Sequence, residues 1–178
     1  VNTTSKKFAL VTSGNFAVTG VAGLTVTGSG SLRINRLGES INQTISTPDG
    51  SVTVSFPTGV DVTRAEATLA LQFSSFVSAS GNFLIEKVDT TDLTTIRASA
   101  TNLDAFLGVN FNAPGEFGVR IDDAGFAMVI EKPAVGSAAF AVSSLGGSLS
   151  ISGLPSLDLD GPLAISINKL GHIIDVDI

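Results

Sequence analysis

Apolar and small polar residues alternate along most of this chain from Phe8 onward. A period of two points successive side chains to opposite faces of an extended backbone, so the pattern predicts half-buried β-strands. Residues 63–72 could form a helix, because Ala and Leu are good helix formers, but they also alternate and a strand is favoured there. Residues 92–107 are the other region where the pattern is ambiguous. The predicted strands lie near residues 8–12, 15–20, 23–28, 31–36, 40–46, 51–56, 66–76, 82–88, 94–101, 103–107, 117–122, 125–131, 139–144, 148–152, 156–160, 163–169 and 172–178.

Tight turns are predicted where Gly and Pro interrupt this alternation. Thr47-Pro48-Asp49-Gly50 places Pro and Gly as a tight turn requires, and Gly28-Ser29-Gly30 is expected to join two further strands. Connections this short join antiparallel neighbours, because a parallel pair needs a crossover of about a dozen residues. The sequence therefore predicts an all-β, antiparallel, hairpin-rich fold.

One stretch of the sequence occurs twice. Residues Leu24–Ile45 match Leu157–Ile178 position by position, with Asn35 and Asn168 separated by 133 positions. In both copies, alternating apolar residues are followed by an Asn, a basic residue, a Leu and a Gly. An offset that stays constant over so many positions indicates an internal repeat.

The match extends backwards beyond this stretch. With a slip of one residue, Phe8-Ala9 falls on Phe140-Ala141. We therefore predict that residues 1–133 form one complete β-repeat unit and that residues 134–178 begin the next.

Two architectures fit such a repeat. In the first, antiparallel hairpins of a tandem repeat stack into an elongated β-solenoid or rod, in which each unit buries its faces against itself and its neighbours. In the second, each unit is a β-sandwich and the units are beads on a string. The only linker-like segment between the units is residues 131–136, and its shortness favours the continuous rod.

Composition narrows the class of protein. Of the 178 residues, 43% are apolar and only 15% charged, which is far from the composition of disordered chains. The chain contains no Cys, which excludes a disulfide framework, a thiolate metal site and a Cys nucleophile. No apolar run approaches the roughly 20 residues of a membrane-spanning helix. No signal peptide stands at Val1, so any targeting segment is expected to be processed away or to lie outside this segment.

Charge argues against nucleic acid as a partner. The net charge is −6, and apart from Lys6-Lys7 the basic residues are scattered singly. Binding to a phosphate backbone requires a concentrated positive surface, which this sequence does not have.

The residues needed for catalysis are scarce. His172 is the only histidine, and the first copy of the repeat has Glu39 at the same place, so a plain surface residue near a turn is expected. Without a second His or any Cys, neither a zinc site nor a His-based nucleophile can be assembled. Gly28-Ser-Gly-Ser is Gly-rich but lacks the Lys and the following helix of a phosphate-binding loop. We predict no catalytic residues and no enzymatic activity.

Calcium is the one metal that the sequence suggests. Asp158 and Asp160 alternate with two leucines, so both carboxylates would lie on the same face of one strand. Further oxygen ligands could come from Asp122 with Asp123 and from Asp175 with Asp177. The first copy of the repeat has threonines in place of the aspartate pair, whereas a structural ion would be kept in both copies. The alternative is a solvated strand face, on which like charges discourage edge-to-edge pairing.

Eleven phenylalanines stand in a chain without Tyr or Trp. Phe lacks the polar tip that is common at binding surfaces, so core packing is expected for them. The clusters are Phe73 with Phe76, Phe106 with Phe111, and Phe117 with Phe126.

Several segments of the sequence resemble those of a known class of protein. They are Gly23-Leu-Thr-Val-Thr-Gly28, Leu32-Arg-Ile-Asn35, Ile41-Asn-Gln-Thr-Ile45, Thr47-Pro-Asp-Gly-Ser-Val-Thr-Val-Ser-Phe56 and Ala105-Phe-Leu-Gly108. They resemble the long tandem repeats of giant secreted or surface proteins of bacteria, usually described as adhesin-like or haemagglutinin-like. The resemblance covers most of the chain through motifs of low complexity, and the calcium nonapeptide of some such proteins is absent. It implies an extracellular or cell-surface location and a structural or adhesive role, and it brings no catalytic residues.

These observations favour a non-enzymatic structural repeat segment of an extracellular filament, sheath or giant cell-surface adhesin. Its partners would be neighbouring repeats or identical subunits, in a homopolymer or one long tandem chain, and surface glycans are a further candidate. The main alternative is a carbohydrate- or ligand-binding β module of a secreted protein, and a third is a β-rich groove that carries lipid. No cofactor other than calcium is expected.

Overall fold

The computed structural model describes residues 7–18, 22, 24–74, 76–144, 146–154 and 160–173, with the side chains of Val18 and Asp160 left out. In this part of the chain every regular element is a β-strand and no helix occurs. All strand pairs are antiparallel, so the all-β, antiparallel prediction is confirmed.

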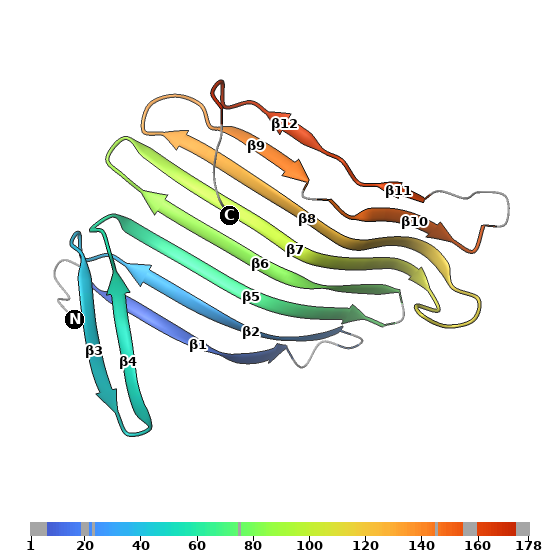
Figure 1. Ribbon diagram of the computed structural model, residues 1–178, viewed down its shortest axis with the longest axis horizontal. Helices are drawn as coiled ribbons and strands as arrows, with labels where there is room; N and C mark the ends of the chain where they lie inside the picture. The colour runs from blue at the N-terminus through green and yellow to red at the C-terminus, as the bar shows by residue number, and fades with distance from the viewer. Residues whose placement is uncertain are drawn as a thin grey trace.

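Most strands join one large sheet (Figure 1). The strands are β1 (Ala9–Val18), β2 (Leu24–Asn35), β3 (Ile41–Thr47), β4 (Gly50–Phe56), β5 (Asp61–Phe73), β6 (Val77–Asp89), β7 (Leu93–Val109), β8 (Phe117–Pro133), β9 (Ala139–Ser144), β10 (Ser148–Ser152), β11 (Asp160–Pro162) and β12 (Ser166–Asn168). The sheet order is β1-β2-β5-β6-β7-β8-β10-β11. The long β8 also pairs with β9, which in turn pairs with β12, while β3 and β4 form a separate hairpin.

The strands are longer than the alternation predicted. Gly28-Ser29-Gly30, expected to be a turn, lies in the middle of β2, and the predicted gap between residues 12 and 15 lies inside β1. These glycines are required for close packing rather than for a turn. A Cβ on Gly28 would come within 2.9 Å of the Phe16 ring. The predicted strand over residues 66–76 is confirmed as β5, which begins earlier, at Asp61.

Two strands change the parity of their apolar positions. In β7 these positions are even up to Ala100 and odd from Leu103, and the register shifts between them. Asn102 takes a positive φ of 50° there, and Asp123 takes one of 48° in the neighbouring β8. Each irregularity is a β-bulge, whose extra residue returns the apolar side chains to the same face. The sequence pattern predicts that one strand ends and another begins near Asn102 and near Asp123, whereas the structure has one continuous strand with a bulge at each place.

The two faces of the sheet differ sharply in polarity. Residues opposite each other in paired strands share a face, so the registers define rows across the sheet. One row consists of Leu32, Ala65, Ile85, Ala98, Met128 and Val142. The adjacent row consists of Arg33, Arg64, Glu86, Arg97, Val129 and Ala141. We call the face of the first row the apolar face and the face of the second row the polar face.

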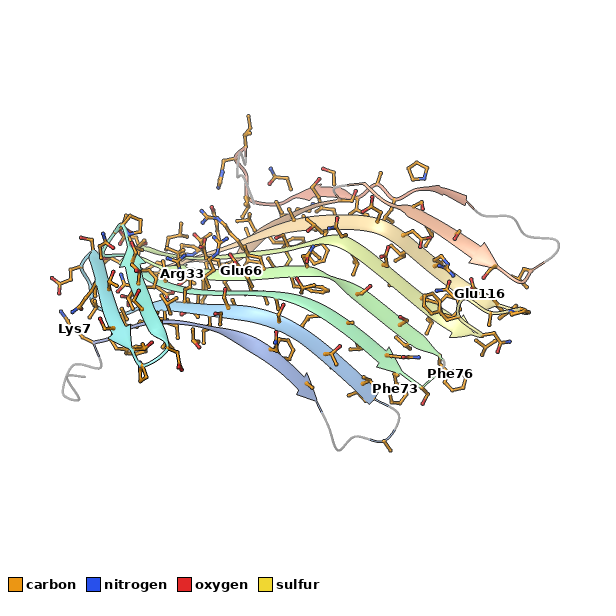
Figure 2. All side chains as sticks on the ribbon, turned by 60° about the horizontal axis from the view of Figure 1, so that its bottom comes forward. Lys7, Arg33, Glu66, Phe73, Phe76 and Glu116 are labelled. Atoms are coloured by element: carbon orange, nitrogen blue, oxygen red, sulfur yellow. The ribbon has the colours of Figure 1, made fainter. Side chains whose placement is uncertain are left out.

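The hairpin β3–β4 lies on the polar face at one end of the sheet (Figures 1 and 2). The Arg33 guanidinium donates a hydrogen bond to the Ser55 carbonyl at 2.7 Å and lies 5.3 Å from the centre of the Phe56 ring. Val54 and Phe56 are buried in this contact. The hairpin therefore covers part of the polar face and leaves the apolar face without a second layer.

The expectation that phenylalanines form the core holds only for part of the set. Phe106 is 2% exposed, on the polar face beneath the loop of residues 110–116. Phe73, Phe76 and Phe117 are about half exposed, and Phe73 and Phe76 lie at the strand ends far from the hairpin (Figure 2). Core packing was wrong for these three, because the apolar face that carries Phe73 and Phe117 is not covered by any described segment.

Candidate interaction surfaces

The two copies of the repeat form hairpins with equivalent registers. In the first copy, Ala9 of β1 lies opposite Asn35 of β2. In the second, Ala141 of β9 lies opposite Asn168 of β12. These are the residues that the sequence match makes equivalent, with the one-residue slip falling on the β9–β10 side, where Gly146 and Gly147 have positive φ.

In both copies the same turn follows the second strand of the hairpin. The Asn35 side chain accepts a hydrogen bond from Leu37 N–H at 3.1 Å and donates to the Glu39 carbonyl at 3.3 Å. The Asn168 side chain accepts from Leu170 N–H at 2.9 Å and donates to the His172 carbonyl at 2.9 Å. The following glycines, Gly38 and Gly171, have φ of 76° and 79°, values that favour Gly.

The second hairpin shows what lies beside a hairpin of this kind. β8 pairs with β10 through its first half and with β9 through its second half. The sheet of residues 1–133 therefore continues into residues 134–178 by ordinary strand pairing.

The corresponding edge of the first hairpin is open. Arg36 N–H donates to Phe8 O at 2.8 Å, so Leu10 and Thr12 also direct their backbone groups to β2. Ala9 and Val11 direct theirs to the other side of β1, where no described strand lies. A row of unpaired donors and acceptors of this kind is a template for another strand.

The polar face carries an open hollow between its two covered ends. The hollow has a volume of about 700 Å³ and spans β1, β2, β5, β6 and β7. Its lining is mainly small and polar, with Ser13, Asn15, Ser29, Thr68, Asn82 and Thr101 among its residues. Phe83 is the one aromatic residue in its described lining, so the hollow lacks the row of aromatic rings that lines many sugar-binding clefts.

An arginine holds the loop of residues 110–116 on the polar face. The Arg120 guanidinium lies 5.0 Å from the centre of the Phe111 ring and 2.7 Å from a Glu116 carboxylate oxygen. The hydrogen bond from Arg120 lowers the pKa of Glu116, and the same carboxylate raises the pKa of Arg120. The group is a structural clamp at the far end of the sheet from the hairpin (Figure 2).

His172 is a surface residue in a turn, as expected, and it also makes an ion pair. Its Nε2 lies 2.9 Å from a Glu131 carboxylate oxygen at the end of β8. The hydrogen bond to Glu131 raises the pKa of His172. No sequence pattern points to this pair, because the two residues are far apart in the chain and only the sheet brings them together.

We expect this pair to make the second hairpin pH-sensitive. A raised histidine pKa means that the protonated form is favoured by folding, so the contribution is present below the unfolded pKa and is lost as pH rises through the folded pKa. Wild type should therefore exceed His172→Gln in thermal stability at about pH 5.5 and should match it at about pH 8.5. A difference between the two that does not change with pH would contradict this.

The calcium hypothesis stays a prediction. Asp158, Asp175 and Asp177 lie outside the described residues. Of Asp160 only the backbone is described, opposite Ser150. Asp122 is placed near Arg120, at 3.7 Å, and Asp123 donates its N–H to an Asp104 carboxylate oxygen at 2.9 Å. Within the described ranges, no three His, Asp or Glu side chains gather as metal ligands would.

Comparison with protein-family models, with curated proteins and with solved structures finds no match to this chain. In the part of the chain that the structure describes, no helix has the length and apolar character needed to cross a bilayer. The geometry of the sheet, its edges and its faces therefore carries the functional argument.

Proposed function

We propose that this chain is a non-enzymatic structural repeat segment of an extracellular filament, sheath or giant cell-surface adhesin. The observation that supports the proposal is the doubled hairpin, whose second copy pairs with β8 and carries the sheet from one unit into the next. In this arrangement residues 1–133 are one unit and residues 134–178 begin another. Its partners are neighbouring units, joined in one tandem chain or as separate subunits.

The proposed mechanism of extension is strand pairing. β1 of each unit pairs with β8 of the preceding unit in the register that β9 and β10 adopt here. β11 and β12 are together equivalent to β2, and they then pair with the β5 strand of their own unit, as β2 pairs with β5 here. Each unit adds six strands to a continuous rod, and its β3–β4 hairpin projects from the polar face.

A chain with two complete units tests this mechanism. It is made by following Ile178 with residues 46–133, because Ile178 is equivalent to Ile45. We expect a single calorimetric transition at a higher temperature than that of the 178-residue chain, because the open edge of β11 and β12 becomes paired. Electron micrographs should show one rod, lengthened by about 29 Å per unit at a strand spacing of about 4.8 Å.

Two other outcomes would count against the proposal. An unchanged melting temperature, with two separate particles per chain in micrographs, would favour independent β-sandwich beads. Compact particles instead of fibres or rods, in native material labelled with an antibody to this chain, would contradict the structural role itself.

The hollow on the polar face supports a second candidate, a carbohydrate- or ligand-binding β module. Its hydroxyl and amide groups offer hydrogen bonds to a sugar, and Leu84 and Phe83 are the large apolar residues of its lining. Saturable, specific binding on a glycan array, abolished by Asn82→Leu, would favour this candidate over the first.

A further inference from the structure

The apolar face of the sheet is open and almost free of polar groups. Its exposed large side chains come from both ends of the sheet and from β1 to β9. They include Leu10, Phe16, Phe73, Ile85, Leu107, Val119 and Phe140. Two described segments that fold over the sheet, the β3–β4 hairpin and the loop of residues 110–116, both lie on the polar face.

Charges on the apolar face are confined to one rim. Arg36 contacts Asp61 at 3.3 Å and Asp89 at 3.4 Å, and Lys87 contacts Asp89 at 2.8 Å. The rows that cross β2 at Leu32, Gly30, Gly28, Val26 and Leu24 carry no charged residue on this face in the described strands. An uncharged centre with a polar rim is the anatomy of a protein interface.

The area of this face exceeds what a stable interface needs. Eight strands stand side by side in the sheet, and β2 has 12 residues. At a strand spacing of about 4.8 Å and a rise of about 3.3 Å per residue, such a face measures about 1,300 Å². A standard interface buries about 800 Å² on each partner.

The alternation of large and small side chains on the apolar face is complementary to the same face of a second copy. Along the row from Leu32 to Met128, large and small side chains alternate from strand to strand: Leu32, Ala65, Ile85, Ala98, Met128. When two such sheets meet about 10 Å apart, large residues of one can enter the gaps over alanines of the other. The rim carries both signs of charge, in Arg36 and Lys87 with Asp61 and Asp89, so it can pair with the rim of a second copy.

From these four observations we infer that the apolar face binds the apolar face of a second copy of this chain, as a two-layer sandwich of two sheets. The contact is isologous, with the same patch on both partners, so it closes at two copies. It differs in this from the pairing of β1 with β8 proposed above, which is head-to-tail and open-ended.

Lysine substitutions in the face test the inference. The side chains of Ile85 and Leu107 are 57% and 63% exposed, so the single chain accommodates Ile85→Lys or Leu107→Lys without loss of fold. The matched control is Ile45→Lys, at an apolar residue 50% exposed on β3, outside the apolar face. Far-UV circular dichroism verifies that each variant is folded.

Light scattering after size exclusion, over a wide range of protein concentration, gives the result. Wild type and Ile45→Lys should have twice the mass of one chain and should dissociate on dilution. Ile85→Lys and Leu107→Lys should raise the dissociation constant about 100-fold or more, because each buries a lysine without a partner.

Three results would overturn the inference. The first is a wild type that stays monomeric, with or without phosphatidylcholine vesicles. The second is a monomer that floats with such vesicles unless Ile85→Lys is present, which would make lipid the occupant. The third is association that survives both lysines but is abolished by Val11→Pro at the open edge of β1. That last result would contradict the face contact and would locate the association at the open edge of β1. It would leave the tandem pairing of the proposed function untouched, because β8 of this chain is already paired with β9 and β10, so the two can fail separately.

Discussion

Asn35→Ala should lower the free energy of unfolding by about 3 kcal/mol. The Asn35 side chain is fully buried, at 0% exposure. It accepts from Leu37 N–H and donates to the carbonyls of Glu39 and Thr58, the latter at 3.1 Å. Alanine leaves these backbone groups without a partner in a site that water does not reach, and an unsatisfied buried group costs about 1–3 kcal/mol.

The chain contains its own control for this prediction. Asn168 makes the same turn bonds at the equivalent place, but it is exposed. Water can replace its partners, so Asn168→Ala should cost less than about 1 kcal/mol. Urea unfolding followed by far-UV circular dichroism measures both, since the chain has no Trp or Tyr for fluorescence. Equal losses for the two variants would show that burial under the β3–β4 hairpin contributes nothing.

Phe106→Ala should cost about 3–5 kcal/mol, the range for removing a buried aromatic side chain. The ring is 2% exposed and its centre lies 4.9 Å from that of Phe111. Beneath it, Gly108 and Gly118 lie opposite each other, and a Cβ on Gly118 would come within 2.9 Å of the ring. Gly108 and Gly118 have no side chains that could fill the space left by the ring.

Phe73→Ala is the matched comparison for Phe106→Ala. Phe73 is 45% exposed on the apolar face, so in the single chain its truncation should cost about 1 kcal/mol. Chemical denaturation at low protein concentration measures both variants. If two copies pair through the apolar face, the cost of Phe73→Ala should grow with protein concentration, while that of Phe106→Ala should not. A loss for Phe106→Ala no larger than that for Phe73→Ala would contradict the packing described for the loop of residues 110–116.

The sequence predicted strand content well, because strand content depends on local pattern. Alternation located most strands of the sheet, although it divided each of β1, β2, β7 and β8 into two. The constant offset between Asn35 and Asn168 predicted equivalent turns, and the side-chain bonds of the two turns match. The turn at Thr47-Pro48-Asp49-Gly50 was also predicted, and it joins β3 to β4.

Glycine was the main source of error. At Gly28 and Gly30 the absence of a side chain was interpreted as a turn, but there it lets Phe16 and Ala67 approach the backbone. Whether a glycine bends the chain or admits a neighbour depends on the adjacent strand, which local sequence does not identify. The bulges at Asn102 and Asp123 had a readable signal, the change from even to odd apolar positions, which was instead interpreted as strand ends.

Exposure of the apolar residues was beyond sequence reasoning. Alternation shows that one face of each strand is apolar, but not whether a second layer covers it. Phe106 and Phe73 both stand in strands of alternating pattern, and they differ in exposure because the loop of residues 110–116 folds over one face only. The Glu131–His172 pair was missed for the same reason, since it depends on which strand ends the sheet brings together.

The order of strands in the sheet follows the order of the chain, apart from the β3–β4 hairpin and the split pairing of β8. A force applied to the two ends of a tandem array would therefore act across the strands and open their hydrogen bonds one after another, as a zipper opens. Six strands span about 29 Å when paired, whereas a unit of about 133 residues reaches about 440 Å when drawn out. Such an array would lengthen about fifteenfold under tension, at low force, and would act as a shock absorber between the points it connects.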